Sequence, residues 1–348
     1  MKRKIMMLLL VGCLLMASAG CGKTGEKGRS DAGGDAEGQE VKTLQLGYAE
    51  PETDINHNYF FATHFKESLE ELSNGAIKVD IFGNNEIGTE QQLMESMQLG
   101  TADMAICINM TVGSFVEETQ IFDLPYFYTS YEEALAVADD PKVNEAVKAG
   151  CEENGLILLG QGIQGFRHVF NNVRPVNSVS DMEGIKVRIP SSQIYRQTFE
   201  ALGANPTEIT GTEAYTALQQ GTVDGIELPY APCVTQNFFE VNKYGSETFH
   251  FFSADDLLMS KQVFDSFTEK EQEWILESGR KAALEQREFV LEMEEDYRQQ
   301  MKDAGVEINS IDDLKPFSKA VQGIVDEYAE IIGIELVEDA KKIVESMR

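Results

Sequence analysis

Hydrophobic and polar positions follow two different periods along the chain, so that short strand-like runs alternate with helical ones. Strand-like runs occur at 43–49 (TLQLGYA), 76–83 (AIKVDIFG), 155–162 (GLILLGQG) and 184–190 (GIKVRIP). Helical spacing of apolar residues occurs at 58–75 (NYFFATHFKESLEELSNG) and 194–203 (IYRQTFEALG). This alternation predicts an α/β fold with mixed sheets.

The longest helical pattern starts after Thr268, which forms a Thr-x-x-Glu capping box with Glu271, and runs to about Asp303 before Gly305. A helix of that length measures about 50 Å. It is longer than one lobe of a chain of this size, so we expect it to lie across two lobes. A break into two helices near Gly279 stays open at this point.

Two segments repeat one plan. Residues 88–106 (GTEQQLMESMQLGTADMAI) and 211–227 (GTEAYTALQQGTVDGIE) each begin Gly-Thr-Glu, continue as a short amphipathic helix, and pass through Gly-Thr-x-Asp into an apolar strand. The Thr hydroxyl can cap each helix and the later Gly can end it. The repeat suggests two similar lobes, although chance reuse of a common helix-to-strand connection is the alternative.

The first residues have the features of an export signal. Lys2, Arg3 and Lys4 precede a twelve-residue apolar run at 5–16, which is shorter than the roughly 20 residues of a membrane span. The following SAGC resembles the end of bacterial lipoprotein signals, despite Ser18 where Leu is commoner. That resemblance implies a signal peptide at 1–20 and a lipidated Cys21 on the outer face of the cytoplasmic membrane; a free Cys21 is the alternative. Residues 21–42 are Gly-rich and polar, which favours a flexible tether.

Charge and cysteine spacing exclude several classes of function. The net charge of −30 argues against nucleic acid as a partner. Cys107, Cys151 and Cys233 show no C-x-x-C spacing, and the four histidines show no H-x-x-x-H pairing. We therefore expect no metal, no cofactor, no disulfide framework and no catalytic residues.

The glycines Gly160, Gly162 and Gly165 have the G-x-G-x-x-G spacing of a dinucleotide site. That site needs a helix that opens at the glycines, but here aromatic and β-branched residues lead to an Asn-Asn turn and Pro175. An NAD-dependent oxidoreductase is therefore the weakest hypothesis.

Arg188 lies in a strand in which Ile185, Val187 and Ile189 form the core face, so its side chain is expected on the opposite face at the strand's C-terminal end. A planar guanidinium there suits a bidentate carboxylate. A solvated arginine on a half-exposed strand is the alternative.

Four segments resemble motifs of the solute-binding subunits of tripartite ATP-independent periplasmic (TRAP) transporters, the DctP family. They are SVSDMEGIKVRIP, EALGANPTEITGTEAYTALQQGTVDGIELP, GNNEIGTEQQLMESMQLGTADMAI and IFDLPYFYTSYEEA, and the likeness runs from about Thr43 to 335. It implies a two-lobed periplasmic-binding-protein-like fold with a ligand cleft between lobes, which we expect at 43–164 with about 258–298 and at 165–257 with about 299–348. It also implies that Arg188 forms the main salt bridge to a ligand carboxylate, that Arg167 assists, and that a permease with small and large membrane subunits is the partner.

The pocket beyond this clamp departs from the family pattern. Leu228 stands where many members have Asn, Ser191 where some have Asn, and Gly211 where some have an aromatic residue. Glu227 is either an acceptor for a ligand hydroxyl or a structural carboxylate.

The expected ligand is a sugar acid such as a hexuronate, with its hydroxyls bound by Glu227, Asn109, Gln193 and Asp256. An oxo acid is the rival, because Leu228 makes the pocket less polar. A dicarboxylate needs a second cation, for which His168 and Lys261 are the candidates. A sensory role in place of transport stays open.

Overall fold

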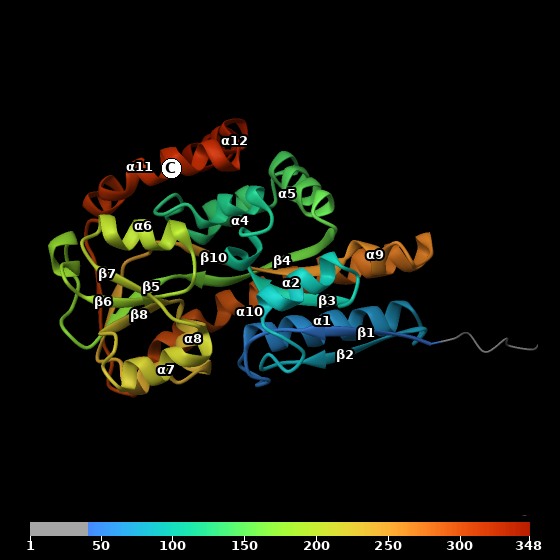
Figure 1. Ribbon diagram of the computed structural model, residues 1–348, viewed down its shortest axis with the longest axis horizontal. Helices are drawn as coiled ribbons and strands as arrows, with labels where there is room; N and C mark the ends of the chain where they lie inside the picture. Colours follow the sequence, from blue (N-terminus) through green and yellow to red (C-terminus); the bar gives the residue numbers. More distant parts are fainter. Residues whose placement is uncertain (1–40) are drawn as a thin grey trace, which may run out of the picture. The chain divides into compact units, whose positions relative to one another are not determined.

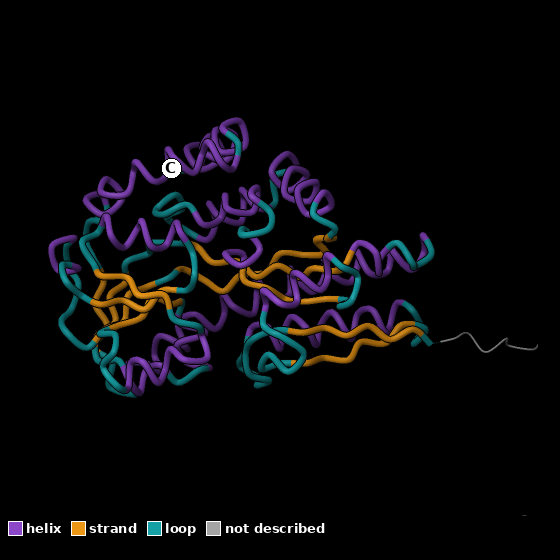
Figure 2. Tube along the Cα trace, viewed as in Figure 1, coloured by secondary structure: helices purple, strands orange, loops and turns teal. Residues whose placement is uncertain are grey.

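The strands pair into two mixed sheets within residues 41–348, the part of the chain that the computed structural model describes (Figure 1). The signal, Cys21 and almost all of the tether lie outside the described residues. Figure 2 shows the two groups of strands with helices packed around each of them. The expected α/β fold with two lobes and mixed sheets is therefore confirmed.

The first sheet has the order β2-β1-β3-β10-β4. Its strands are β2 (Ile77–Phe82), β1 (Lys42–Gly47), β3 (Met104–Ile108), β10 (Phe252–Ser260) and β4 (Leu156–Phe166). β10 runs antiparallel to both neighbours, whereas β1 is parallel to β2 and β3. Around this sheet the chain forms α1 (His57–Leu72), α2 (Glu90–Gln98), α3 (Asn109–Val112), the 3-10 helix η1 (Glu117–Asp123), α4 (Tyr131–Ala138), α5 (Pro141–Glu153) and α9 (Lys261–Phe264).

The second sheet has the order β11-β9-β5-β8-β6-β7. Its strands are β11 (Glu307–Ser310), β9 (Tyr244–Glu247), β5 (His168–Asn171), β8 (Gly225–Leu228), β6 (Lys186–Ile189) and β7 (Asn205–Glu208). Between them lie the 3-10 helices η2 (Val179–Met182) and η3 (Phe238–Val241) and the helices α6 (Gln193–Ala201), α7 (Gly211–Gln219) and α8 (Tyr230–Thr235).

The repeated segments are one helix and one interior strand in each sheet. The first is α2 followed by β3, and the second is α7 followed by β8. Thr89 caps α2 as expected, and the left-handed Gly100 and Gly221 follow the two helices. We expected the Thr of the second Gly-Thr-Glu to cap its helix, and this was wrong. Helix α7 begins at Gly211, and its N-cap is Thr210, whose side chain makes no capping hydrogen bond.

The long helix is α10 (Glu269–Asp303), which is continuous over 35 residues and capped by Thr268 and Glu271. It packs on α1 and β4 of the first lobe and on α8 of the second. A helix that spans both lobes is therefore confirmed, and the alternative of a break near Gly279 is wrong.

The glycines of β4 make room for this helix. A Cβ on Gly160 would lie 2.5 Å from the carbonyl oxygen of Gly279, and a Cβ on Gly279 would lie 2.6 Å from the Cβ of Leu159. Gly165 has a φ of +121° at the end of β4. The glycine spacing therefore reflects close packing of a strand against a helix, not a phosphate site.

The limits of the two lobes remain predictions. Two segments, however, pack against the lobe to which the prediction did not assign them. β10 belongs to the first sheet from Phe252, ahead of the predicted limit at 257. The C-terminal helices α11 (Lys315–Ile332) and α12 (Ile334–Met347) are drawn at the top of Figure 1; α11 contacts both lobes, whereas α12 contacts the first. α11 packs on α6 and η1, and α12 packs on α4 and α5.

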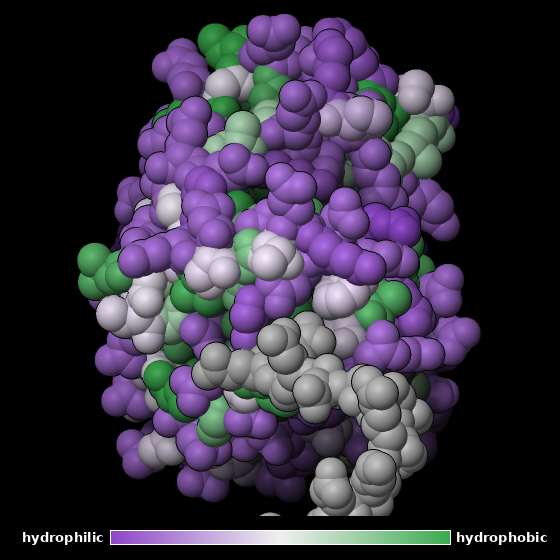
Figure 3. Space-filling model, turned by 90° about the vertical axis from the view of Figure 1, so that its right-hand side faces the viewer, coloured by the Kyte–Doolittle hydropathy of each residue, from purple (hydrophilic) through white to green (hydrophobic). Residues whose placement is uncertain are grey.

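The face shown in Figure 3 is mostly hydrophilic, with hydrophobic residues in small separate groups, as the net charge of −30 leads one to expect. Within residues 41–348, none of the helices has the length and apolar character needed to cross a membrane.

Candidate functional site

A buried ion pair between Arg167 and Glu227 lies where the chain first leaves β4 for the second sheet. Arg167 follows Phe166, the last residue of β4, and its backbone N–H donates to the carbonyl of Phe251 at 2.9 Å. Its Nε donates to Glu227 Oε2 at 2.6 Å and its Nη2 to Glu227 Oε1 at 2.9 Å. Both side chains are almost fully buried. The pair therefore joins the β4–β5 connection to β8.

The remaining donors of Arg167 are also largely used. Nη2 donates to the Glu227 carbonyl at 3.0 Å and Nη1 to Ser253 Oγ at 3.4 Å. Since a guanidinium has five N–H groups, one N–H on Nη1 is left over among the described contacts. His250 Nε2 lies 3.2 Å from Glu227 Oε2.

The charge states of Arg167, Glu227 and His250 follow from their burial and from their contacts with one another. Burial alone would raise the pKa of Glu227, but Arg167 and His250 hold it below the ordinary value. Burial alone would lower the pKa of Arg167, but the Glu227 carboxylate raises it. Burial lowers the pKa of His250, against its hydrogen bond to Glu227, which favours the neutral imidazole at neutral pH.

Arg188, on β6, differs from Arg167 in its partners. Its Nε donates to the carbonyl of Ile209 at 2.8 Å, and within residues 41–348 its two terminal nitrogens have no hydrogen-bond or ion-pair partner. The residue is 6 % exposed. Burial lowers its pKa to about 10, with nearby Glu227 opposing and Arg167 adding to that shift. Arg188 is therefore a buried cation at neutral pH, and its outer N–H groups are free of protein acceptors.

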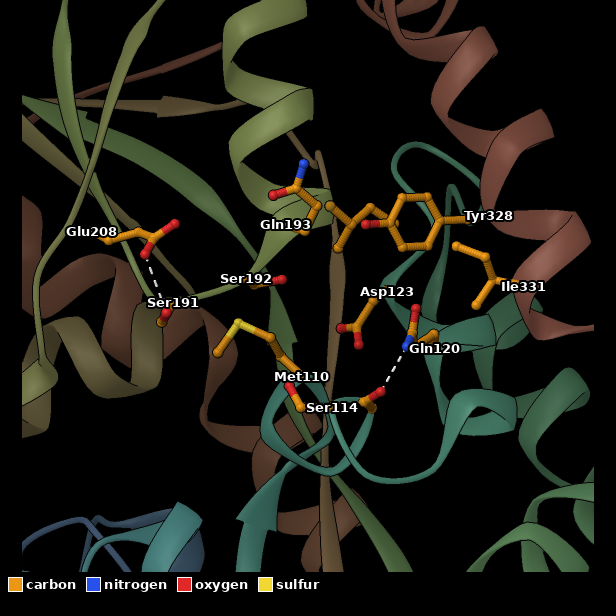
Figure 4. Close-up of a pocket in the computed structure, with 12 residues that line it drawn as sticks. Met110, Ser114, Gln120, Asp123, Ser191, Ser192, Gln193, Glu208, Tyr328 and Ile331 are labelled. Atoms are coloured by element: carbon orange, nitrogen blue, oxygen red, sulfur yellow. Dashed lines mark hydrogen bonds between the residues drawn. The ribbon is translucent and has the colours of Figure 1, made fainter.

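A cavity of about 340 Å³ lies beyond the C-terminal end of β6 and is covered by α11 (Figure 4). Its polar lining comes from η1, from residues 191–193 between β6 and α6, from Ser114 and Glu208, and from Tyr328 of α11. The residues used below are Gln120, Asp123, Ser191, Ser192, Gln193 and Tyr328. Neither arginine is among its lining residues.

Asp123 links this cavity to the arginines. The residue is 2 % exposed and lines the cavity, while its Oδ2 accepts a hydrogen bond from Asn109 Nδ2 at 2.9 Å. Burial raises the pKa of Asp123 to about 8, and the charge of nearby Arg167 works in the opposite direction. At neutral pH the carboxyl is therefore mainly protonated and uncharged.

Among the other residues expected to bind a ligand, Gln193 lines the cavity and Asn109 holds Asp123. Leu228 packs in a hydrophobic cluster of the second lobe. Asp256 lies in the first sheet between β3 and β4, where Gln161 donates to its Oδ1 at 2.9 Å, and it does not line the cavity. Glu227 has both carboxylate oxygens occupied, which favours the structural alternative.

Neither His168 nor Lys261 is suited to bind the second carboxylate of a dicarboxylate ligand. Burial lowers the pKa of His168 to about 3, so its imidazole is neutral at neutral pH. Lys261 follows the far end of β10 and pairs with Asp265 at 2.9 Å on the surface.

The sequence did not point to three side chains that lie near Arg167 and Glu227, namely Asp123, His250 and Tyr195. The Tyr195 ring lies 5.3 Å from the Arg167 guanidinium carbon. The one local signal was an aspartate between Phe122 and Leu124 in an apolar run, since a charged residue in such a run needs a reason to be buried.

Metal and disulfide chemistry find no support in the part of the chain that the structure describes. No group of three or more Cys, His, Asp or Glu residues there could hold a metal ion. Cys107, Cys151 and Cys233 are buried and unpaired within residues 41–348.

Comparison with known proteins gives a consistent result. Residues 46–331 match the family model described as bacterial extracellular solute-binding protein, family 7 (DctP). The 2,3-diketo-L-gulonate-binding periplasmic protein YiaO of Escherichia coli is 30 % identical over 281 residues, which are 81 % of this chain and 85 % of that protein.

Two solved structures of TRAP periplasmic solute-binding proteins are similar as well. The protein of Polaromonas sp. JS666, bound to D-erythronate, is 32 % identical with a TM-score of 0.82 and covers 86 % of this chain and 98 % of its own. The protein of Bordetella bronchiseptica, with density interpreted as pantoate, is 33 % identical with a TM-score of 0.81 and the same coverage.

Proposed function

The chain belongs to family 7 of the bacterial extracellular solute-binding proteins, the DctP family, and we propose that it captures an organic acid with one carboxylate and several hydroxyls for a TRAP permease. Members of this family are the solute-binding subunits of transporters, so the chain is a binding protein and not an enzyme. The small and large membrane subunits of the permease are the proposed partners.

One observation carries the carboxylate part of this proposal. Arg188 is a buried cation whose two outer nitrogens have no acceptor among residues 41–348. A guanidinium with this little solvent contact and no protein acceptor on its outer nitrogens suits a ligand carboxylate that accepts from both of them. Arg167 keeps one N–H for a supporting contact, while Glu227 neutralises its charge.

The charge count favours a single carboxylate. Glu227 pairs with Arg167 and leaves Arg188 without a carboxylate partner among residues 41–348. The neighbouring His250 and Asp123 are mainly neutral, and Glu208 at the cavity is paired with Arg196, so one positive charge remains. A ligand with a single carboxylate balances that charge. A second carboxylate would have neither His168 nor Lys261 as a partner, since the first is neutral and the second is paired at the surface.

The ligands of similar proteins agree with this class. YiaO is named for 2,3-diketo-L-gulonate, and the two solved structures are described with D-erythronate and pantoate. All three are monocarboxylates with hydroxyl groups. A sugar acid such as a hexuronate is our specific choice for this chain, with Gln193 near its hydroxyls.

We also propose that the protein is exported and held by a lipid on Cys21, with residues 22–41 as a tether, since Lys42 already belongs to β1. This part rests on the sequence pattern alone. Mass spectrometry of the native protein from membranes should find a lipidated N-terminal Cys21. A mature form that starts elsewhere, or that leaves the membrane without detergent, would contradict the anchor.

A thermal-shift screen tests the proposed ligand class. It should include D-erythronate, D-galactonate, D-glucuronate, pantoate, succinate and 2-oxobutanoate. Ligand at 100 times its Kd stabilises a protein by about 2.7 kcal/mol, so a true ligand should raise the unfolding temperature by several degrees. Hydroxylated monocarboxylates should give the largest shifts. A larger shift with succinate would contradict the charge argument, and a response to 2-oxobutanoate alone would replace sugar acids by oxo acids.

A further inference from the structure

We propose that Asp123 is the residue that selects hydroxylated acids, by hydrogen bonding a ligand hydroxyl through the carboxyl oxygen not held by Asn109. This inference rests on the proposed function and assigns a specificity-determining role within the same site.

The geometry gives Asp123 one fixed and one free oxygen. It is the last residue of η1, and Figure 4 shows its carboxyl between the Ser192–Gln193 segment on one side and Gln120 and Tyr328 on the other. Oδ2 accepts from Asn109 Nδ2 at 2.9 Å, and within residues 41–348 Oδ1 has no hydrogen-bond partner. A carboxyl oxygen that lines a cavity without a protein partner is a site for a ligand donor or acceptor.

The carboxyl is held in place from behind. Asn109 is fully buried, and its Nδ2 also donates to the carbonyl of Thr119 at 2.9 Å. Thr119 in turn is held by a hydrogen bond from its hydroxyl to the carbonyl of Val116 at 2.8 Å. These contacts fix the orientation of Asp123 before a ligand arrives. Binding therefore costs little conformational entropy at this side chain.

The protonation state makes the residue compatible with an anionic ligand. Its surroundings contain Arg167, the buried Asp256, and Tyr128, Tyr195 and Tyr328, and burial is the main cause that raises its pKa to about 8. At neutral pH a protonated Asp123 does not repel the ligand carboxylate. Since Oδ2 accepts from Asn109, the proton belongs on Oδ1, where it can be donated to a hydroxyl oxygen.

A ligand without that hydroxyl leaves the carboxyl unpaired. An alkyl chain at this place would bury Asp123 without a partner, and a site built to bind a hydroxyl rejects the analogue that lacks it. Gln120, Ser192 and Gln193 add further polar groups around the same cavity. The cavity therefore favours polyhydroxylated acids over alkyl acids of equal length.

The test compares D-erythronate with butanoate, which has the same carbon chain and carboxylate but no hydroxyls. Calorimetry on the whole mature protein should show tighter binding of erythronate. Asp123→Ala should weaken erythronate binding by about 10- to 100-fold, the loss of one buried hydrogen bond. It should tighten butanoate binding, because alanine removes the carboxyl that butanoate leaves unpaired. Asp123→Asn keeps the shape and the hydrogen-bonding capacity, so it should retain most of the erythronate affinity.

Asp326→Asn, on the exposed side of α11, controls for the loss of one acidic residue, and circular dichroism checks that each variant folds. Equal erythronate affinity in the wild type and Asp123→Ala would overturn the assignment, while loss of binding in Arg188→Ala would still support the proposed function. If neither erythronate nor any acid of the screen binds the wild type, the proposed function fails, and the role of Asp123 fails with it.

Discussion

Arg167 and Glu227, 60 residues apart in the sequence, form a bidentate ion pair with distances of 2.6 and 2.9 Å and almost no solvent exposure. The pair fixes β8 to the start of β5 and neutralises one of the two arginines of the site. It leaves Arg188 as the guanidinium without a carboxylate partner within residues 41–348.

Removing one partner of this pair should be costly. Glu227→Ala leaves the buried Arg167 without its carboxylate, and the expected loss is about 3–5 kcal/mol in the free energy of unfolding. Urea denaturation monitored by circular dichroism measures it. The matched control is Glu208→Ala, which breaks a half-exposed pair with Arg196 and should cost no more than about 1 kcal/mol. Equal losses in the two variants would contradict a structural role for Glu227.

The contact of β4 with α10 should tolerate no side chain at its glycines. Gly160→Ala places a methyl group 2.5 Å from the Gly279 carbonyl oxygen, and such overpacking costs about 1–3 kcal/mol. Gly323→Ala is the control, because that glycine lies inside α11 with nothing within 4 Å of an added Cβ. Alanine there should stabilise the helix by about 1 kcal/mol. Thermal unfolding of the two variants should therefore shift in opposite directions, and a shift in the same direction would contradict this account of the glycines.

Ligand affinity should depend on pH through Asp123. The protonated form is the one that suits an anionic ligand, and the raised pKa keeps it protonated up to about pH 8. Above that pH the carboxyl ionises in the free protein, so binding has to take up a proton, and Kd should rise by up to about tenfold per pH unit. Calorimetry with D-erythronate from pH 6 to 9 measures this.

Asp123→Asn removes the titrating group and should flatten the pH profile. Burial leaves the pKa of Arg188 at about 10, so this arginine stays charged through most of that range. An unchanged profile in Asp123→Asn would assign the pH dependence to another group.

The sequence predicted those parts of the fold that local signals determine. The capping box of Thr268 and Glu271, the strand alternation around Arg188 and the glycines after α2 and α7 each act within a few residues. The start of α7 was misplaced because Gly211 and Thr212 offered a familiar capping pattern, whereas the N-cap lies two residues earlier, at Thr210.

The site was predicted only in part, because its contacts join distant elements. Arg188 could be found from one strand, but the pairing of Arg167 with Glu227 depends on β5 and β8 lying side by side. The role of Asn109 as the support of Asp123 depends on the packing of α3 against η1. The pKa of Asp123 depends on burial by several elements, for which no short motif exists.

The carboxylate clamp at Arg188 is tested most directly by calorimetry on Arg188→Ala, with Arg188→Lys as the control that keeps the charge and loses the planar fork. The ligand is the acid that gives the largest thermal shift. Arg188→Ala should cost about 2–5 kcal/mol, which is roughly 30-fold to several thousand-fold in Kd. Arg167→Ala should cost less in binding, because Glu227 already takes most of its donors. Wild-type affinity in Arg188→Ala would contradict the central claim.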